Sequence, residues 1–170
     1  MTGRRAQPEH QLQIQINKFV REMVACSHQF ASHDRSPPRT PLQHAREKMR
    51  GTVRGWPDTE LLLSGGVTFR CELKAPGEYP NESQRVIGGR LRALGHPWAW
   101  ANSVTEYLKA AREAGVPFHP NADLRAQDLD LVLQGAAMKR EGVAPKSYRA
   151  RGATKPRRKG AITTAKLIGM

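Results

Sequence analysis

Three charged residues at separated positions could together hydrolyse a phosphodiester bond. Asp58 and Glu72 carry carboxylates, the hard oxygen ligands that magnesium and manganese prefer. Lys74 stands two residues after Glu72, so the two side chains would share one face of an extended strand. A lysine there could orient or activate the attacking water and stabilise the charged transition state, and the carbonyl of Leu73 could complete the metal ligands. The spacing predicts a metal-dependent hydrolytic site.

Each piece of this pattern also has a simpler interpretation. A Glu-x-Lys pair on a strand is often a solvent-exposed ion pair, and Glu9 could merely stabilise the start of a helix through the helix dipole. Gln84 could merely complete a capping box with Asn81. The combined order favours a site: an acid on a first helix, Gly-x-Pro-Asp, a hairpin, Glu-x-Lys, and a glutamine on the next helix.

The composition indicates one basic domain. The chain has 170 residues, a formal net charge of +13 and 38% hydrophobic residues, which can build one modest core. A protein this basic commonly binds a polyanion, most often nucleic acid. A solubility tail or a ribosome-type packing protein would have the same charge, so charge alone does not decide between these classes.

Neither a membrane span nor a secretory signal is expected. No apolar run approaches the roughly 20 residues that cross a bilayer, and residues 1–8 are polar and basic. Two cysteines do not make a disulfide framework, and Cys71 lies in an apolar strand pattern typical of a core residue. We therefore expect a cytoplasmic protein. Zinc binding is disfavoured because the spacing of the candidate ligands matches no standard zinc framework. Those candidates are Cys26, His28, His33 and His44.

The apolar pattern predicts a compact α/β core of alternating helices and strands. The expected elements are a helix over 8–24, a loop over 25–40, a short helix over 41–50, strands over 58–64 and 67–75 joined by a turn at 64–66, a helix over 81–94, a strand over 97–101 and a helix over 104–114. The predicted buried positions are Leu12, Ile16, Phe19 and Met23 on the first helix, Leu61, Leu62 and Leu63 on the first hairpin strand, Phe69, Cys71 and Leu73 on the second, and Ile87, Leu91 and Leu94 on the helix that follows.

Two further features concern contacts of the chain. The pair Gly88-Gly89 costs helix stability, which suggests close packing on the sheet or on another subunit. A capping box of Ser103 and Glu106 is expected to open the helix over 104–114.

The C-terminal part differs in character from the core. An additional helix is expected over 123–139, followed by a basic and flexible extension that binds phosphates without reading sequence. We therefore divide the chain into a catalytic domain over 1–118, a helical segment over 119–142 and a basic tail over 143–170. The residues that we expect to contact DNA are Lys48, Arg50, Arg54, Arg85, Arg157, Arg158 and Lys159. On local sequence alone, the basic residues over 46–54 could equally form a solvated charged face.

The ordered set from Glu9 to Gly115 resembles the virus-type replication-repair nuclease (VRR-NUC) family, a branch of the PD-(D/E)XK phosphodiesterases. The segments that carry the resemblance are Glu9-x-x-Leu12-Gln13, Gly51-Thr-Val-Arg-Gly55-Trp-Pro57-Asp58, Cys71-Glu72-Leu73-Lys74, and Gln84 ahead of Leu91-x-x-Leu94-Gly95. The resemblance implies a restriction-endonuclease-like core, in which a small mixed β-sheet is flanked by helices, and DNA cleavage that depends on magnesium or manganese.

The resemblance also implies a role for each matching residue. Asp58 and Glu72 would be metal ligands, Lys74 the catalytic lysine, Gln84 a helix glutamine near the site, and Glu9 a first-helix acid that supports metal binding. The resemblance is to the small stand-alone members of the family, which are typical of phages. It implies a homodimer that cuts branched DNA such as Holliday junctions. We expect this chain to act in that way. The alternatives are a non-catalytic DNA-binding protein on a nuclease frame and a sequence-specific nuclease of the restriction type.

Overall fold

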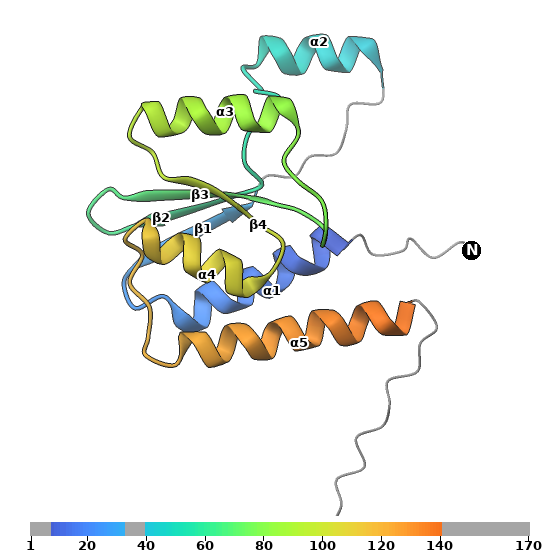
Figure 1. The fold of residues 1–170 in the computed structure, drawn as a ribbon. Helices are drawn as coiled ribbons and strands as arrows, with labels where there is room; N and C mark the ends of the chain where they lie inside the picture. Colours follow the sequence, from blue (N-terminus) through green and yellow to red (C-terminus); the bar gives the residue numbers. More distant parts are fainter. Residues whose placement is uncertain (1–7, 33–39, 141–170) are drawn as a thin grey trace, which may run out of the picture.

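A computed structural model describes residues 8–32 and 40–140, which form a small mixed β-sheet flanked by helices (Figure 1). The predicted α/β class is confirmed at this level. In chain order the elements are α1 (Pro8–Met23), β1 (His28–Ser32), α2 (Pro41–Met49), β2 (Thr59–Leu63), β3 (Thr68–Leu73), α3 (Glu82–Ala93), β4 (Trp98–Ala101), α4 (Val104–Glu113) and α5 (Ala122–Arg140).

The four strands lie side by side in the order β1-β2-β3-β4. β2 and β3 form the predicted antiparallel hairpin, and Gly65 and Gly66 in its turn have φ angles of +88° and +82°. The Gly66 N–H donates to the Leu63 carbonyl at 3.3 Å across the turn, and glycine adopts the positive φ of Gly65 and Gly66 without strain. The Ser-Gly-Gly sequence therefore sets the register that brings the start of β2 beside the end of β3.

β4 pairs with β3 in parallel, and α3 makes the crossover between them. The N-terminus of α3 therefore lies near the C-terminal end of β3, where Glu72 and Lys74 are located. The predicted capping box at this end is confirmed: the Asn81 side chain accepts from the Gln84 N–H, and the Gln84 side chain accepts from the Asn81 N–H. The sequence thus fixes the position of Gln84 through local hydrogen bonds.

The predicted loop over 25–40 is wrong in its first part, because His28–Ser32 is the edge strand β1. This strand pairs antiparallel with β2, with Phe30 opposite Leu61. Its residues are half-buried or exposed, so the polar sequence His-Gln-Phe-Ala-Ser has no strong alternation. The strand forms because β2 offers an edge to pair with, which is a tertiary effect that local propensity does not report. Residues 33–39 lie outside the described part of the chain.

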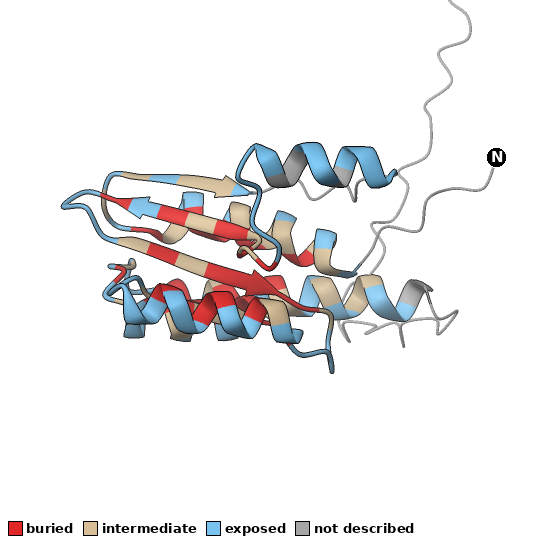
Figure 2. Cartoon of the chain, turned by 90° about the horizontal axis from the view of Figure 1, so that it is seen from above, coloured by how far each residue is buried: buried red, intermediate tan, exposed pale blue. Residues whose placement is uncertain are grey.

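The main core lies between one face of the sheet and the helices α1, α4 and α5 (Figures 1 and 2). β3 turns Phe69, Cys71 and Leu73 toward this core, as predicted, and Phe69 packs edge-on against Tyr107 of α4. The predicted stripe on α1 is buried except at its end, where Val20 is buried and Met23 is only half-buried. Since Phe69, Cys71 and Leu73 face the main core, the alternate residues Glu72 and Lys74 point to the other face of the sheet.

Two leucines that the sequence pattern predicts to be buried are exposed. Leu62, the middle of the three leucines of β2, is 41% exposed, and Leu94 is 73% exposed at the C-cap of α3. On the face of the sheet opposite the main core, α3 packs on β4. It leaves the β2 side of that face, with Leu62, exposed to solvent. The run of three leucines therefore alternates between core and solvent like an ordinary strand.

α5 packs on α1 and α4 and contributes Ala122, Ala126 and Leu129 to the main core. Its Asp130 accepts hydrogen bonds from the backbone N–H groups of Val104 (2.7 Å) and Thr105 (3.1 Å) at the start of α4. Ser103 caps the same helix by accepting from the Glu106 N–H, but the Glu106 carboxylate accepts from Asn102 rather than closing the expected box. Asp130 therefore supplies an acceptor that local sequence does not show. No helix among the described residues is long and apolar enough to cross a membrane.

Gly88 and Gly89 provide a matched test of how α3 packs. A Cβ on Gly88 would lie 2.5 Å from the Trp98 ring, whereas a Cβ on Gly89 would meet nothing within 4 Å. We expect Gly88→Ala to lower the free energy of unfolding by about 1–3 kcal/mol through overpacking. Gly89→Ala should raise it by up to about 1 kcal/mol through helix propensity. Urea unfolding of both variants measures the difference, and equal stability of the two would contradict the packing of α3 on β4.

Candidate functional site

Asp58 stands between Pro57 and the start of β2, at the end of a turn that leads from α2. Gly55 in this turn has a φ of +86°, and a Cβ there would lie 2.5 Å from the carbonyl oxygen of Ser83. Glycine is therefore needed because the turn lies against the first turn of α3. The Asp58 Oδ2 atom accepts a hydrogen bond of 2.8 Å from the backbone N–H of Leu73. This bond fixes the carboxylate beside the residue that separates Glu72 from Lys74.

Glu72 and Lys74 lie at the end of β3 on the face opposite the main core. The Glu72 residue is 0% exposed and Lys74 is 9% exposed, and the Lys74 Nζ lies 2.9 Å from the Glu72 Oε1. The interpretation of this Glu-x-Lys pair as a solvent-exposed ion pair is therefore wrong. A buried pair costs desolvation of both groups, so it is weak evidence for stability and compatible with a functional role.

Gln84 connects this pair to α3. Its Oε1 accepts the Asn81 N–H at 2.8 Å, which completes the cap, while its Nε2 donates to the Glu72 Oε1. One amide thus satisfies the helix start and a buried carboxylate together. Gln84 is itself nearly buried, so its orientation is set on both sides. The capping role and the site role that the sequence offered as alternatives are both present.

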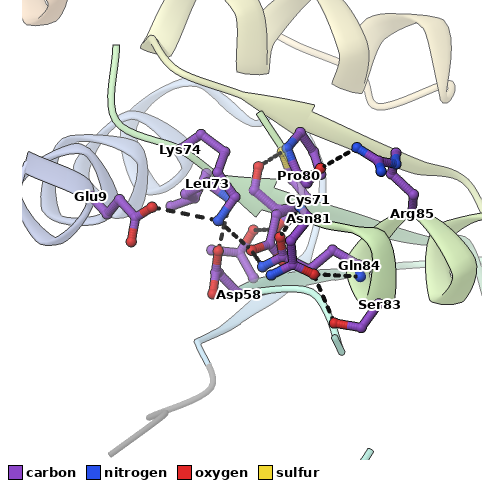
Figure 3. Close-up of polar contacts among 12 residues, drawn as sticks. Glu9, Asp58, Cys71, Leu73, Lys74, Pro80, Asn81, Ser83, Gln84 and Arg85 are labelled. Atoms are coloured by element: carbon purple, nitrogen blue, oxygen red, sulfur yellow. Dashed lines mark hydrogen bonds and ion pairs between the residues drawn. The ribbon is translucent and has the colours of Figure 1, made fainter. Parts of the chain in front are cut away.

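Glu9 in the first turn of α1 completes the group from the other side. Its Oε1 lies 3.5 Å from the Lys74 Nζ, and its side chain is partly exposed. Figure 3 shows the side chains of Glu9, Asp58, Lys74 and Gln84 directed toward the end of β3 from four separate segments. The structure therefore brings all five predicted catalytic residues together.

Lys74 is the positive centre of this acidic group. Burial alone would lower the pKa of Lys74, but its hydrogen bond to Glu72 and the negative charges of Glu72, Glu9 and Asp58 outweigh burial and raise it. Since the folded-state pKa is raised, the pairing stabilises the fold below the ordinary pKa of 10.5 and is lost as the pH rises through the folded value. At neutral pH Lys74 is an ammonium, suited to hold an anion or a water rather than to accept a proton.

The donor chemistry fits a hard divalent cation that also binds a substrate phosphate. Asp58 and Glu72 offer carboxylate oxygens, and magnesium is commonly held by one or two carboxylates together with phosphate oxygens and water. In residues 8–32 and 40–140 no three His, Cys, Asp or Glu side chains form a group that could hold a metal by themselves. To hold such a cation these two carboxylates would need further oxygen ligands, such as a backbone carbonyl, water or a phosphate. Of the zinc candidates that the sequence disfavours, His33 and the His44 side chain lie outside the part that the structure describes.

The predicted DNA-contacting residues are only partly covered by the structure. Arg50 and Arg54 are exposed on the segment that runs from α2 to the turn before Asp58. Arg85 is exposed on α3, where its Nη1 donates to the Pro80 carbonyl at 2.9 Å. The Lys48 side chain and the residues Arg157, Arg158 and Lys159 lie outside the part that the structure describes. The described arginines therefore lie on the two segments that border the acidic group.

The sequence reasoning did not assign a role to the aromatic residues around the site. Tyr79, in the loop between β3 and α3, contacts Trp100 of β4 with ring centroids 5.4 Å apart. Trp56 lies over the guanidinium of Arg70, which also pairs with Glu60 at 2.6 Å. The Trp-x-Trp pattern of β4 was the available signal, because alternate strand residues share a face.

The two cysteines should differ strongly in reactivity. Burial, followed by the nearby carboxylates of Glu72 and Asp58, raises the pKa of the Cys71 thiol well above its ordinary value, whereas Cys26 is partly exposed. The thiolate is the nucleophile, so iodoacetamide should modify Cys26 in the folded protein and Cys71 only after unfolding. Mass spectrometry of the tryptic peptides, with and without urea, checks this. Rapid labelling of Cys71 in the folded chain would contradict the placement of β3.

No family model matches the chain, and no curated protein or solved structure is significantly similar to it.

Proposed function

We propose that the protein is a magnesium- or manganese-dependent DNA endonuclease with a restriction-endonuclease-like core of the VRR-NUC kind. The observation that carries the proposal is the convergence of Asp58, Glu72 and Lys74, with Gln84 and Glu9 behind them, on one end of β3. A buried carboxylate beside a lysine, bordered by exposed arginines in a strongly basic chain, is suited to phosphodiester chemistry.

In this proposal Asp58 and Glu72 would hold the metal, and the Leu73 carbonyl would be a third protein ligand. The bound cation would neutralise charge on the scissile phosphate and polarise its phosphoryl oxygen. The Lys74 ammonium orients the attacking water by hydrogen bonding and stabilises negative charge as it develops in the transition state. Gln84 fixes the Glu72 carboxylate through its Nε2, and Glu9 supports the ammonium from the opposite side. Arg50 and Arg54 would hold phosphates of the DNA on either side of the cut.

We further propose that the substrate is branched DNA, such as a Holliday junction, and that two subunits act together in a bacterial or phage-infected cell. Gly88 packs against Trp98 of the same chain. Gly89 and Val86, by contrast, are both exposed on α3. This surface is our candidate for the contact between subunits. Two symmetric copies would place two active sites on opposite strands of a junction with twofold symmetry. Light scattering at several protein concentrations tests the dimer directly.

The experiment that tests the function is cleavage of a labelled four-way junction with magnesium or manganese, in parallel with flap, nicked, gapped and linear duplexes. We expect cuts near the branch that stop when a chelator is added. Mapping the cut positions distinguishes a structure-specific nuclease from one of the restriction type, which would cut linear duplex at fixed sequences. Tight binding to every substrate without cleavage in either metal would instead support the non-catalytic alternative.

One observation favours that alternative and makes the experiment necessary. The Glu72–Lys74 pair is nearly buried and supported by Gln84, which is also how a purely structural ion pair is held. A nuclease frame that only binds DNA would keep this pair because losing one member would leave a buried charge alone. Because Asp58 is only half-buried and lies outside the buried Glu72–Lys74 pair, its substitution separates the two interpretations.

A further inference from the structure

We propose that Tyr79 and Trp100 form a stacking site for one unpaired nucleobase of the DNA substrate, next to the phosphate that the acidic group would cleave. This inference rests on the proposed function, and it gives a physical reason why the protein would prefer DNA that has an unpaired base. It names a part of the substrate, an unpaired base, that the charged residues cannot recognise.

The position of Trp100 relative to the site follows from the sheet. Trp100 of β4 is the register partner of Glu72 in β3, and the two strands are parallel. Neighbouring strands lie about 4.8 Å apart and register partners turn their side chains to the same face. The indole of Trp100 is therefore on the face of the Glu72 carboxylate, where it packs against the cluster of Ile87, Leu91 and Trp98 under α3. Its position is rigid because strand pairing and this cluster hold it from two directions.

Tyr79 extends this aromatic surface into solvent. Its ring meets the Trp100 ring at an interplanar angle of 62°, yet the residue is 72% exposed. The backbone on both sides is anchored, by the Glu78 N–H donating to the Ala75 carbonyl at 2.9 Å and by Arg85 donating to the Pro80 carbonyl. The loop thus holds a large aromatic ring outward, only a few residues after Lys74, with one edge against Trp100 and most of its surface available.

A nucleobase is the occupant that this chemistry fits best. The ring of a tyrosine beside a tryptophan offers a flat π surface, on which any base can stack whatever its sequence. The chain carries a net charge of +13, which attracts the DNA backbone to the protein. Bases inside a continuous duplex are already stacked on their neighbours and cannot reach a side chain without being flipped out. The platform therefore selects DNA that has an unpaired or easily unpaired base beside the cut, as at a branch point, a flap or a gap.

The test measures stacking itself rather than cleavage. A short duplex carries a single-nucleotide bulge of 2-aminopurine, whose fluorescence falls when it stacks, and a matched duplex carries 2-aminopurine in a normal base pair. Binding is titrated without added metal and with chelator, using the full chain and the variants Tyr79→Ala and Tyr79→Phe. Leu94→Ala is the matched control, because Leu94 is similarly exposed (73%) and lies at the far end of α3.

We expect the unmodified chain, Tyr79→Phe and Leu94→Ala to bind the bulged DNA with quenching. Tyr79→Ala should weaken that binding about 5- to 150-fold, the range that one stacked base supplies. Its affinity for the fully paired duplex should stay within about twofold, because phosphate contacts supply that affinity. Equal weakening on both DNAs, or no quenching by the unmodified chain, would overturn the proposal.

Failure of this inference and failure of the nuclease proposal give different results. If the unmodified chain and Tyr79→Ala cut branched DNA at the same rate and neither quenches 2-aminopurine, the protein is a nuclease without the stacking site. A chain that quenches 2-aminopurine through Tyr79 and cuts nothing has the stacking site without the activity. Circular dichroism spectra check that each variant is folded, which we expect because Tyr79 lies in a loop and is 72% exposed.

Discussion

Replacing Asp58 with asparagine is expected to abolish DNA cleavage while leaving the fold intact. The amide oxygen of the new side chain can still accept the hydrogen bond that the Leu73 N–H donates to Asp58 at 2.8 Å. The neutral amide, however, binds a divalent cation far more weakly than a carboxylate does. Loss of several kcal/mol of transition-state stabilisation corresponds to a rate lowered by about 10³-fold or more. Single-turnover cleavage of the labelled junction measures the effect.

Asp128→Asn is the matched control for this substitution. Asp128 is exposed on α5, and the change alters the net charge by the same amount. We expect its cleavage rate and its unfolding transition to match those of the unmodified chain. If Asp58→Asn cut the junction at the unmodified rate, Asp58 would not be a metal ligand and the proposed site would be wrong.

The second large effect is on stability and involves Lys74. Lys74→Ala leaves the buried carboxylate of Glu72 without its ammonium partner, and breaking a buried ion pair by removing one member costs about 3–5 kcal/mol. We expect urea unfolding to show a loss of this size. Removing both charges, in the double variant Glu72→Gln and Lys74→Met, should restore most of the stability because no buried charge is left alone.

The double variant separates stability from catalysis. It is expected to fold, to bind DNA through the exposed arginines and to be inactive, since the ammonium and one metal ligand are gone. Cleavage by a well-folded double variant would show that the ion pair is only structural. A Lys74→Ala variant as stable as the unmodified chain would show that Glu72 is not buried with Lys74 in solution.

Local sequence signals predicted the parts of the site that depend on short-range structure. The Ser-Gly-Gly turn sets the hairpin, and strand alternation places Glu72 and Lys74 on one face. The Asn81–Gln84 pattern predicts the helix cap, which the structure confirms. These features follow from two-residue and three-residue spacings, so they need no knowledge of distant contacts.

Other parts depend on contacts between distant segments, and the sequence gives little sign of them. The edge strand β1 is too polar and too weakly alternating to be recognised, and it exists because β2 has an edge to pair with. Asp130 of α5 caps α4 from 26 residues away. The Glu72–Gln84 bond requires that α3 begins beside the end of β3, which only the crossover to β4 ensures. The order of motifs suggested that these residues meet, but the hydrogen bonds that position them come from the fold.

The contact between Tyr79 and Trp100 also depends on distant segments, so the sequence alone did not predict it. Tyr79 and Trp100 are 21 positions apart and carry no joint signal in the sequence. They meet because the loop after β3 and the strand β4 flank the same end of the sheet. The charged residues carry the proposed chemistry, while the aromatic pair carries the proposed preference for an unpaired base.

The most direct test of the metal site is manganese binding followed by electron paramagnetic resonance. Free Mn²⁺ is measured as the protein is titrated in the presence of junction DNA whose scissile phosphates are replaced by uncleavable analogues, with the DNA alone as background. The unmodified chain is predicted to remove Mn²⁺ from solution beyond that background. Asp58→Asn, which should bind the same DNA, is predicted to remove no more than the DNA alone. Equal Mn²⁺ uptake by the two proteins, or none by either, would contradict a site in which Asp58 and Glu72 hold a divalent cation beside the phosphate.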